Sequence, residues 1–198
     1  MIMSNSQLQI ILGSQSPRRR ELMAGLGLPF TSVSIDADES YPENLKAEEI
    51  PIYISRVKAH AYEPKLLPSQ LLITADTIVW CNNKMLGKPH DEEEACEMLR
   101  QLSGRTHHVF TAVTFLMQGH PMETIVDATK VTFRTLTEEE ILHYVKEYRP
   151  LDKAGAYGVQ EWIGYAACTH LNGSYFNVMG FPTHLVYEQL QKFTALVQ

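Results

Sequence analysis

The stretch from Leu71 to Trp80 constrains the fold of this chain most, because nine of its ten residues carry no charge. It reads Leu-Leu-Ile-Thr-Ala-Asp-Thr-Ile-Val-Trp, and its β-branched and aromatic side chains favour a buried strand. Asn82-Asn83 then offers a tight turn into Met85-Leu86. A carboxylate in the middle of such a strand costs several kcal/mol unless it is paired, hydrogen-bonded or bound to a cation. Asp76 is therefore the residue whose predicted burial most calls for a chemical explanation.

Strand and helix patterns alternate along the first part of the chain, and two adjacent strands follow them. Further strands are predicted at Gln9–Gly13, Thr106–Met117, Glu123–Thr135 and Tyr157–Leu171. Helices are predicted at Pro17–Leu26, at Glu48–Tyr62, from Asp91 to Leu102, from Thr137 to Tyr148, and at Thr183–Val197. Gln118-Gly119-His120-Pro121 reads as the turn that joins the middle two strands. This order predicts an α/β fold with a mixed sheet.

Two of the predicted helices begin at recognisable caps. Asp91 stands three residues before Glu94, and Thr137 stands three residues before Glu140, which is the spacing of a capping box. Helical spacing also assigns apolar residues to the buried helix faces. These are Ile50, Ile54, Val57 and Ala61, then Ala95, Met98, Leu99 and Leu102, and finally Ile141, Leu142, Val145 and Tyr148.

The charge balance argues against a long polyanion as partner. The chain has 17 Lys and Arg against 23 Asp and Glu, a formal net charge of -6, so we expect no DNA or RNA partner. The three cysteines share no short spacing, which fits a reducing cytoplasm better than a disulfide framework. There is no signal-peptide pattern, and no apolar run approaches the roughly 20 residues of a membrane span. We expect one continuous domain over residues 1–198 in the cytoplasm, with no membrane partner.

Three arginines, Arg18 to Arg20, follow Ser14, Ser16 and Pro17 in the first turn of a predicted helix. The backbone N–H groups and the positive end of the helix dipole attract anions there, and each arginine should cost a few tenths to about 1 kcal/mol. A bound polyanion would reverse the sign of that cost. The 100° step per residue places Arg18 and Arg19 beside the apolar stripe, toward a ligand, and turns Arg20 to solvent. The alternative is a basic surface turn paired with nearby acids such as Glu21.

Other charged residues are weaker candidates. Asp36, Asp38 and Glu39 are candidates to assist Asp76 in activating water or holding a divalent cation, although a solvated loop explains the first two better. Lys88 lies between Gly87 and Pro89, and it is a candidate only as a further phosphate contact beside the arginines. The chain has no G-x-x-x-x-G-K-[ST] phosphate loop, no G-x-G-x-x-G and no H-E-x-x-H.

Six blocks, in order, closely resemble the Maf family of nucleoside triphosphate pyrophosphatases. The blocks are Ser14-Gln15-Ser16-Pro17-Arg18-Arg19-Arg20-Glu21-Leu22, Ala75-Asp76-Thr77, Gly87-Lys88-Pro89, Leu102-Ser103-Gly104-Arg105-Thr106-His107, Asp152-Lys153-Ala154-Gly155-Ala156-Tyr157-Gly158-Val159-Gln160, and Gly173-Ser174-Tyr175-Phe176-Asn177-Val178-Met179-Gly180-Phe181-Pro182. The resemblance implies two α/β lobes with a central cleft, similar to inosine triphosphatase. It also implies a homodimer and a requirement for magnesium or manganese.

The resemblance further implies roles for single residues. Asp76 matches the proton acceptor of the family, and Arg18, Thr77 and Gln160 match the positions linked to base specificity. Ser14, Arg19, Lys58 and Lys88 are then expected to bind phosphate, and Asp76 and Glu39 to hold the metal. The Gly-Ala-Tyr-Gly-x-Gln block is similar to the branch that converts dTTP and UTP to the monophosphate and pyrophosphate.

Two departures from the family pattern bear on this interpretation. Glu161 stands where the family usually has Gly, and Ala112 stands where Gly is usual. The first lies beside the expected base pocket, so 7-methyl-GTP remains an alternative substrate. A non-catalytic, nucleotide-binding regulator of cell division remains an alternative of another class, but it would leave the burial of Asp76 unexplained.

Overall fold

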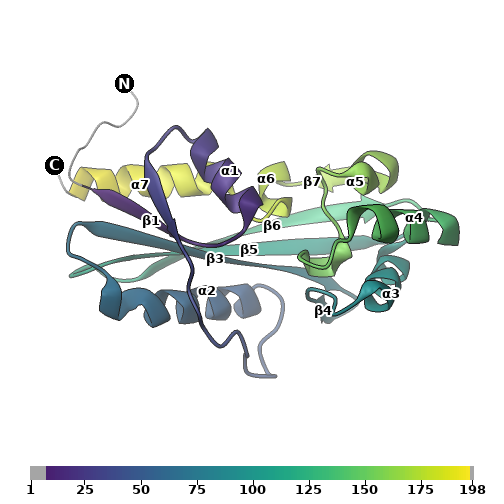
Figure 1. Cartoon of the computed structure of the whole chain (residues 1–198), viewed down its shortest axis with the longest axis horizontal. Coiled ribbons are helices and arrows are strands. Elements are labelled where there is room, and N and C mark those ends of the chain that lie inside the picture. The colour runs from purple at the N-terminus through teal and green to yellow at the C-terminus, as the bar shows by residue number, and fades with distance from the viewer. Residues whose placement is uncertain (1–7, 197–198) are drawn as a thin grey trace. The chain divides into compact units, whose positions relative to one another are not determined.

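A computed structural model describes residues 8–196, in which seven strands form one sheet (Figure 1). The strands are β1 (Gln9–Gly13), β2 (Phe30–Val33), β3 (Gln70–Cys81), β4 (Lys84–Leu86), β5 (Thr106–Met117), β6 (Glu123–Phe133) and β7 (Cys168–Asn172). Their order is β2-β1-β3-β5-β6-β7, and β4 pairs with β3. The strand β1 is parallel to β2 and β3, whereas β4 is antiparallel to β3 and β7 to β6. This confirms the α/β class and the mixed sheet.

The chain divides into two compact units, in line with the two expected lobes. Unit 1 comprises the described residues of Met1–Asp76, Thr111–Val126 and Gly180–Gln198, and unit 2 comprises Thr77–Phe110 and Asp127–Met179. The strands β3, β5 and β6 each contribute residues to both units. The cleft expected between the lobes and the single domain over residues 1–198 stay predictions.

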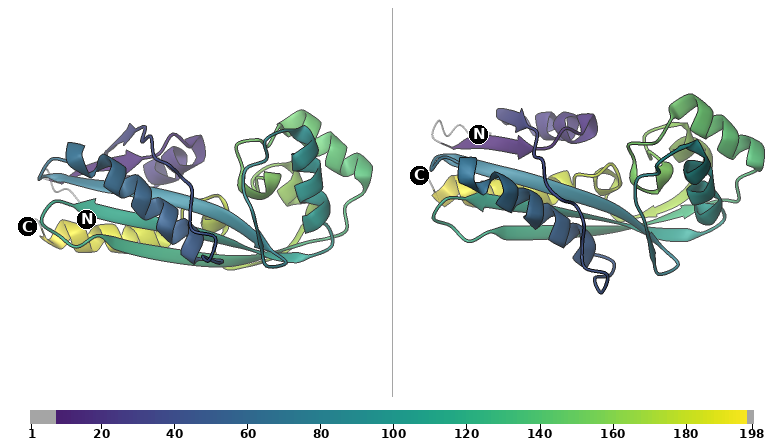
Figure 2. Two further views of the ribbon diagram at one scale, coloured as in Figure 1. Left: turned by 90° about the horizontal axis from the view of Figure 1, so that it is seen from below. Right: turned by 60° about the horizontal axis from the view of Figure 1, so that its bottom comes forward.

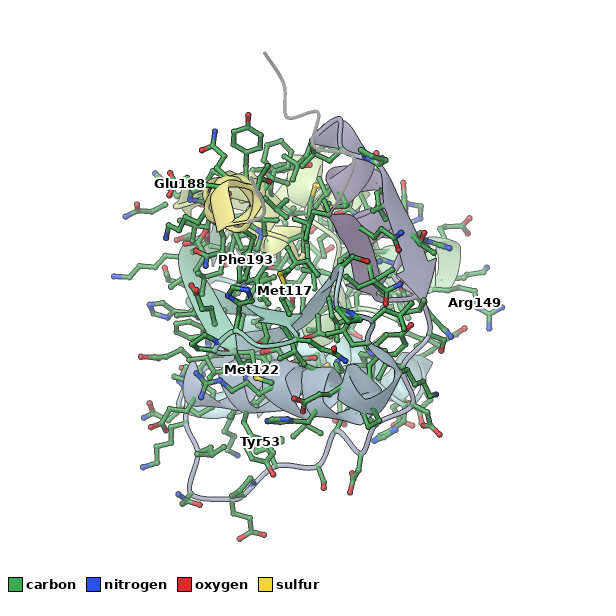
Figure 3. The ribbon with its side chains drawn as sticks, turned by 90° about the vertical axis from the view of Figure 1, so that its left-hand side faces the viewer. Tyr53, Met117, Met122, Arg149, Glu188 and Phe193 are labelled. Carbon is green, nitrogen blue, oxygen red and sulfur yellow. The ribbon has the colours of Figure 1, made fainter. Side chains whose placement is uncertain are left out.

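In unit 1, the helices α2 (Glu49–Tyr62) and α7 (Thr183–Leu196) lie on opposite faces of the strands (Figure 3). Phe193 points from α7 toward the sheet and stacks on Phe115 of β5, with ring centroids 5.9 Å apart. Tyr53 points away from the sheet on the outer side of α2 and is exposed. The helix α1 (Pro17–Gly25) buries Leu22 and Met23.

A chain of hydroxyl groups fastens α2 to the strands of unit 1. Thr74 of β3 is fully buried and donates a hydrogen bond of 2.7 Å to the carbonyl oxygen of Ser55 in α2. The Ser55 hydroxyl in turn lies 2.8 Å from the hydroxyl of Thr114 in β5, and the Thr114 hydroxyl lies 3.0 Å from the hydroxyl of Thr124 in β6. Side chains of Thr74 and Asp76 share a face of β3, because side chains alternate along a strand. The hydroxyl contact therefore sets the register of the helix that faces Asp76.

In unit 2, the helices α3 (Glu92–Leu102) and α4 (Glu138–Tyr148) pack against each other (Figure 2). Both predicted caps are confirmed. Asp91 accepts the N–H of Glu94 at 2.8 Å, and Thr137 and Glu140 form a reciprocal capping box. Phe133, Tyr144 and Val109 belong to one apolar core with the buried residues of both helices.

The prediction of a strand over Tyr157–Leu171 is wrong for most of its length. A turn closes between Gly158 and Glu161, the helix α5 (Trp162–Ala167) follows, and only Cys168–Asn172 is a strand. Gly164 explains the difference, because a Cβ there would lie 1.8 Å from the carbonyl oxygen of Val159. The chain folds back on itself at this glycine, and Trp162 packs beside His143 and Tyr144 of α4 instead of joining the sheet.

Two predicted helix faces are wrong in part. In α4 the buried residues are Ile141, Tyr144 and Val145, whereas Leu142 and Tyr148 are exposed. In α2 the exposed Ala61 lies off the buried face, which includes Ala59 and the polar Ser55 instead. The apolar pattern missed this face because a hydrogen-bonded hydroxyl occupies part of it.

The sequence patterns also missed two short elements, β2 and the four-residue helix α6 (Tyr175–Val178). The predicted strand Glu123–Thr135 ends at Phe133, and the predicted helix end at Val197 lies outside the described residues. None of the helices in residues 8–196 is long and apolar enough to cross a membrane.

Replacing the buried hydroxyl of Thr74 should test how α2 is fastened. We expect Thr74→Val to lower the free energy of unfolding by about 1 kcal/mol, because the side chain keeps its shape and loses one hydrogen bond. The matched control is Thr31→Val on the exposed side of β2, which should change stability by less than about 0.5 kcal/mol. Urea unfolding measures both, and equal effects of the two substitutions would contradict the assignment.

Candidate active site

The centre of the candidate site is an ion pair between β3 and α2. The Lys58 Nζ lies 2.8 Å from the Asp76 Oδ1, and the two side chains are 12% and 13% exposed. Residues Ser55 and Lys58 lie three apart on α2, so one helix face supplies both the contact to Thr74 and the contact to Asp76. The buried carboxylate that the sequence singles out is thus paired within unit 1.

Burial has the largest effect on the pKa of Asp76. It raises the pKa of the Asp76 carboxyl, while the positive charges of Lys58 and Arg19 oppose the rise. Glu39, in the loop before α2, raises it further by repulsion. The Glu39 Oε1 lies 3.1 Å from the Lys58 Nζ, so one ammonium group serves two carboxylates. Such a carboxyl binds a proton more readily than a solvated one.

Arg19 reaches from the first turn of α1 to the backbone beside Asp76. Its Nη1 donates to the carbonyl oxygen of Ala75 at 2.8 Å, and its Nε donates to that of Gly180 at 2.9 Å. Burial lowers the pKa of Arg19 and the neighbouring Arg18 lowers it further, while Asp76 and Glu39 raise it. Arg18 is half-buried and Arg20 is exposed, as the helical spacing predicts. The guanidinium group of Arg19 therefore lies near the carboxylate of Asp76.

Two serines shape the start of α1. Ser16 is the N-cap and accepts the N–H of Arg19. Ser14 is nearly buried, and its hydroxyl accepts the N–H of Ser16 at 3.2 Å. The first turn of α1 contains no acidic residue. The helix dipole and the arginines of this turn thus give this end of the helix a positive potential.

The remaining predicted residues belong to unit 2. Thr77 follows Asp76 in β3 and is half-buried, and Lys88 is exposed. The carbonyl oxygen of Gly87 accepts the N–H of Gly155 at 2.9 Å, which holds the loop of Lys88 against the segment that leads to Gln160. The Oε1 of Gln160 is buried and has no hydrogen-bond partner among the described residues.

Residues 9–193 match the family model described as Maf-like protein. The chain belongs to the Maf family. A dTTP/UTP pyrophosphatase of Bacteroides thetaiotaomicron is 52% identical over 193 residues, which cover 97% of this chain and all of the relative. Proteins of the same name from Porphyromonas gingivalis and Flavobacterium johnsoniae are 49% and 48% identical and cover 98% and 92% of this chain, and 98% and 93% of their own lengths.

Among solved structures, a HAM1 protein from Coxiella burnetii matches with a TM-score of 0.49 at 14% identity. That match covers 93% of this chain and 99% of the other.

The structure thus brings together some of the residues inferred from the resemblance to the Maf family. In unit 1, Arg18, Arg19, Lys58, Asp76 and Glu39 are linked by contacts or by their mutual electrostatic effects. Asp36 and Asp38 behave as solvated loop residues, since both are exposed and Asp38 accepts the N–H of Ser40.

Sequence reasoning missed the residues that hold this candidate site in place. Thr74 and Ser55 fasten α2, and the carbonyl oxygen of Gly180 receives Arg19. One signal was available for Thr74, because it is a polar residue two positions before Asp76 in an otherwise apolar strand and therefore shares its face. No local signal identifies Gly180, which lies 161 residues from Arg19.

Removing the ammonium group of Lys58 should make stability depend more strongly on pH than in the wild type. Lys58→Met leaves Asp76 without its nearest cation, so the pKa of the carboxyl in the folded protein rises further. A carboxyl with a raised folded pKa takes up a proton on folding, and stability then falls as the pH rises toward that pKa. We expect a loss of about 3 kcal/mol at pH 8 and a smaller loss at pH 5 in urea unfolding.

The control for this change is Lys65→Met, at an exposed lysine of the same unit. It should leave the unfolding midpoint nearly unchanged at both pH values. A loss for Lys58→Met that is the same at pH 5 and pH 8 would show that the ammonium group does not stabilise the ionised Asp76.

Proposed function

We propose that the protein is a nucleoside triphosphate pyrophosphatase that hydrolyses dTTP and UTP to the monophosphate and pyrophosphate. The observation that carries this proposal is the buried Asp76 carboxylate beside Lys58 and Arg19, because it combines a proton acceptor with charges that attract phosphate. The names of the Maf relatives support the choice of substrates.

The reaction begins with attack of a water oxygen on the α-phosphorus. The bond from the α-phosphorus to the bridging oxygen of the β-phosphate breaks, and pyrophosphate leaves with that oxygen. Asp76 accepts the proton of the attacking water, which requires the carboxylate form. Lys58 stabilises that form before the reaction, since its ammonium group lies 2.8 Å from the carboxylate.

Positive groups would bind the triphosphate and would stabilise the negative charge that develops on the leaving pyrophosphate. Ser14, Arg18, Arg19 and the N-terminus of α1 supply this charge and hydrogen bonding in unit 1, together with Lys58. Lys88 is exposed in unit 2 and is proposed as a further phosphate contact. Arg19 has a second task, because its bonds to Ala75 and Gly180 hold the backbone next to Asp76.

Gln160 is proposed to recognise the base by hydrogen bonding, and Arg18 and Thr77 are proposed as further residues that determine base specificity. A carboxamide offers a donor and an acceptor together, which suits the adjacent carbonyl and N–H groups of uracil and thymine. The buried and unpartnered Oε1 of Gln160 is an acceptor that a ligand could satisfy.

The residues fit a divalent cation that arrives with its substrate. No group of three or more metal-ligating side chains occurs in residues 8–196. The carboxylates of Asp76 and Glu39, however, both contact the ammonium group of Lys58. Mg²⁺ typically uses one or two carboxylates and completes its shell with phosphate oxygens and water. Asp76 and Glu39 would hold magnesium or manganese, which would shield the phosphate charge and acidify a bound water.

Several further properties are part of the proposal. We expect a homodimer, a cytoplasmic location and no nucleic-acid partner. The net charge of -6 supports the last of these, since a long polyanion would meet net repulsion.

Asp76→Asn tests the central role of the carboxylate. We expect it to reduce pyrophosphate release from dTTP and UTP at least a thousandfold, because a carboxamide cannot accept the proton, while nucleotide binding persists. The control is Glu43→Gln, the same change of carboxylate to carboxamide at an exposed position of unit 1. Assays of wild type on dTTP, UTP and 7-methyl-GTP complete the test.

Three results would count against the proposal in different ways. Wild-type turnover by Asp76→Asn would remove Asp76 from the mechanism. A preference of the wild type for 7-methyl-GTP would overturn the base assignment. No release of pyrophosphate from any common nucleotide would favour the non-catalytic nucleotide binder.

The proposed metal ligands lead to a separate prediction. Removal of divalent cations by chelation should abolish pyrophosphate release, and added magnesium or manganese should restore it. Glu39→Gln should raise the metal concentration needed for half-maximal activity about tenfold, because one of two carboxylate ligands is lost. An unchanged metal requirement in this variant would exclude Glu39 as a ligand.

A further inference from the structure

Glu161, which departs from the usual family pattern, is held at both carboxylate oxygens in unit 2. The Lys153 Nζ lies 3.1 Å from its Oε1, and the hydroxyl of Tyr144 donates to its Oε2. The side chains of Lys153 and Glu161 are 10% and 20% exposed, and Tyr144 is fully buried. A carboxylate with two such partners has little freedom to rotate.

The same tyrosine also binds the backbone of the turn that carries Gln160. The N–H of Gly158 donates to the Tyr144 hydroxyl oxygen at 3.0 Å, and the N–H of Glu161 donates to the carbonyl oxygen of Gly158 at 3.0 Å. Burial raises the pKa of Tyr144, and the bond to Glu161 raises it further, so the hydroxyl stays a neutral donor. One hydroxyl group thus ties the first and the last residue of the turn 158–161 together.

The side chains of Gln160 and Glu161 fold back over Gly158. A Cβ added to Gly158 would lie 3.0 Å from the Nε2 of Gln160 and 2.9 Å from the Cδ of Glu161. The amide nitrogen of Gln160 and the carboxylate of Glu161 therefore both lie close to the same point beside Gly158. A negative carboxylate attracts the N–H groups of a carboxamide and repels its oxygen. Glu161 consequently favours one of the two orientations of the Gln160 amide.

The orientation of this amide matters for the choice of base. Uracil and thymine present a carbonyl oxygen at C4 where cytosine presents an amino group, and the neighbouring N3 changes from donor to acceptor in the same way. A carboxamide in one orientation matches uracil and thymine, and the flipped carboxamide matches cytosine. A site with a fixed amide therefore rejects the wrong base, because a buried donor would face a donor and a buried acceptor would face an acceptor.

We propose that Lys153, Glu161 and Tyr144 form a positioning triad that fixes the amide orientation of Gln160 and thereby excludes cytosine nucleotides. This inference rests on the proposed function for the role of Gln160. The triad contains no catalytic residue, since its members act on the base only through Gln160.

Two substitutions loosen the triad in different ways. Tyr144→Phe removes the hydroxyl that joins Gly158 and Glu161, and Glu161→Gln keeps the size of the side chain but removes its charge. The matched control is Tyr148→Phe, the same loss of a hydroxyl one helical turn further along α4, where the residue is exposed and stacks on Tyr144. Near-ultraviolet circular dichroism establishes that each variant is folded.

The test compares kcat/KM for UTP with kcat/KM for CTP. In both triad variants we expect the ratio to fall at least tenfold, with the change in KM and little change in kcat, because the triad orients the base and takes no part in the chemical step. Tyr148→Phe should keep the wild-type ratio. A purely structural role of the triad would lower both activities together and leave the ratio intact, and that result would overturn the proposal.

Binding of the non-hydrolysable α,β-imido analogues of dUTP and dCTP, measured by calorimetry, separates this inference from the proposed function. A wild type that releases no pyrophosphate would refute the proposed function, while a preference for the dUTP analogue that is lost in the triad variants would still support the triad. Equal binding of both analogues by wild type, or a preference that survives both substitutions, would overturn it.

Discussion

The contact between Lys58 and Asp76 determines how the rest of unit 1 is built. Two opposite charges buried to this degree cost more to desolvate than they return unless their geometry is well fixed. The fold fixes it with a second contact on the same helix face, where Thr74 binds the carbonyl oxygen of Ser55. The helix α2 is thereby held at two points on one strand, and its register follows from them.

The same ion pair explains why polar residues interrupt the apolar pattern on both elements. Thr74 and Asp76 alternate with apolar residues along β3, and Ser55 and Lys58 occupy the inner side of α2. An apolar face would pack as well, but it would lack the ammonium group and the carboxylate on which the proposed phosphate binding and proton transfer depend. Buried charged groups that reduce stability are typical of functional sites, and this supports the proposed role of Asp76.

Much of the fold is predictable from the sequence because its signals are local. The caps at Asp91 and Thr137 and the long apolar run around Asp76 each specify an element from adjacent residues. The segment after Tyr157 is not predictable in this way, because the close approach of Gly164 to Val159 depends on the turn that precedes it. Asp76 is visible as a buried carboxylate, whereas its partner Lys58 depends on packing between α2 and β3.

The charges around Asp76 give a reason for a metal ion beyond family resemblance. Two cations, Arg19 and Lys58, act on the carboxylates of Asp76 and Glu39, so the charges of these four groups balance. A nucleoside triphosphate brings several negative charges, which this balanced set of groups does not neutralise in a partly buried setting. Without further positive charge, the carboxylates and the phosphates would repel each other at short range. A divalent cation held by Asp76 and Glu39 would reduce the repulsion between these carboxylates and the phosphates, which supports the proposal that the metal enters together with the nucleotide.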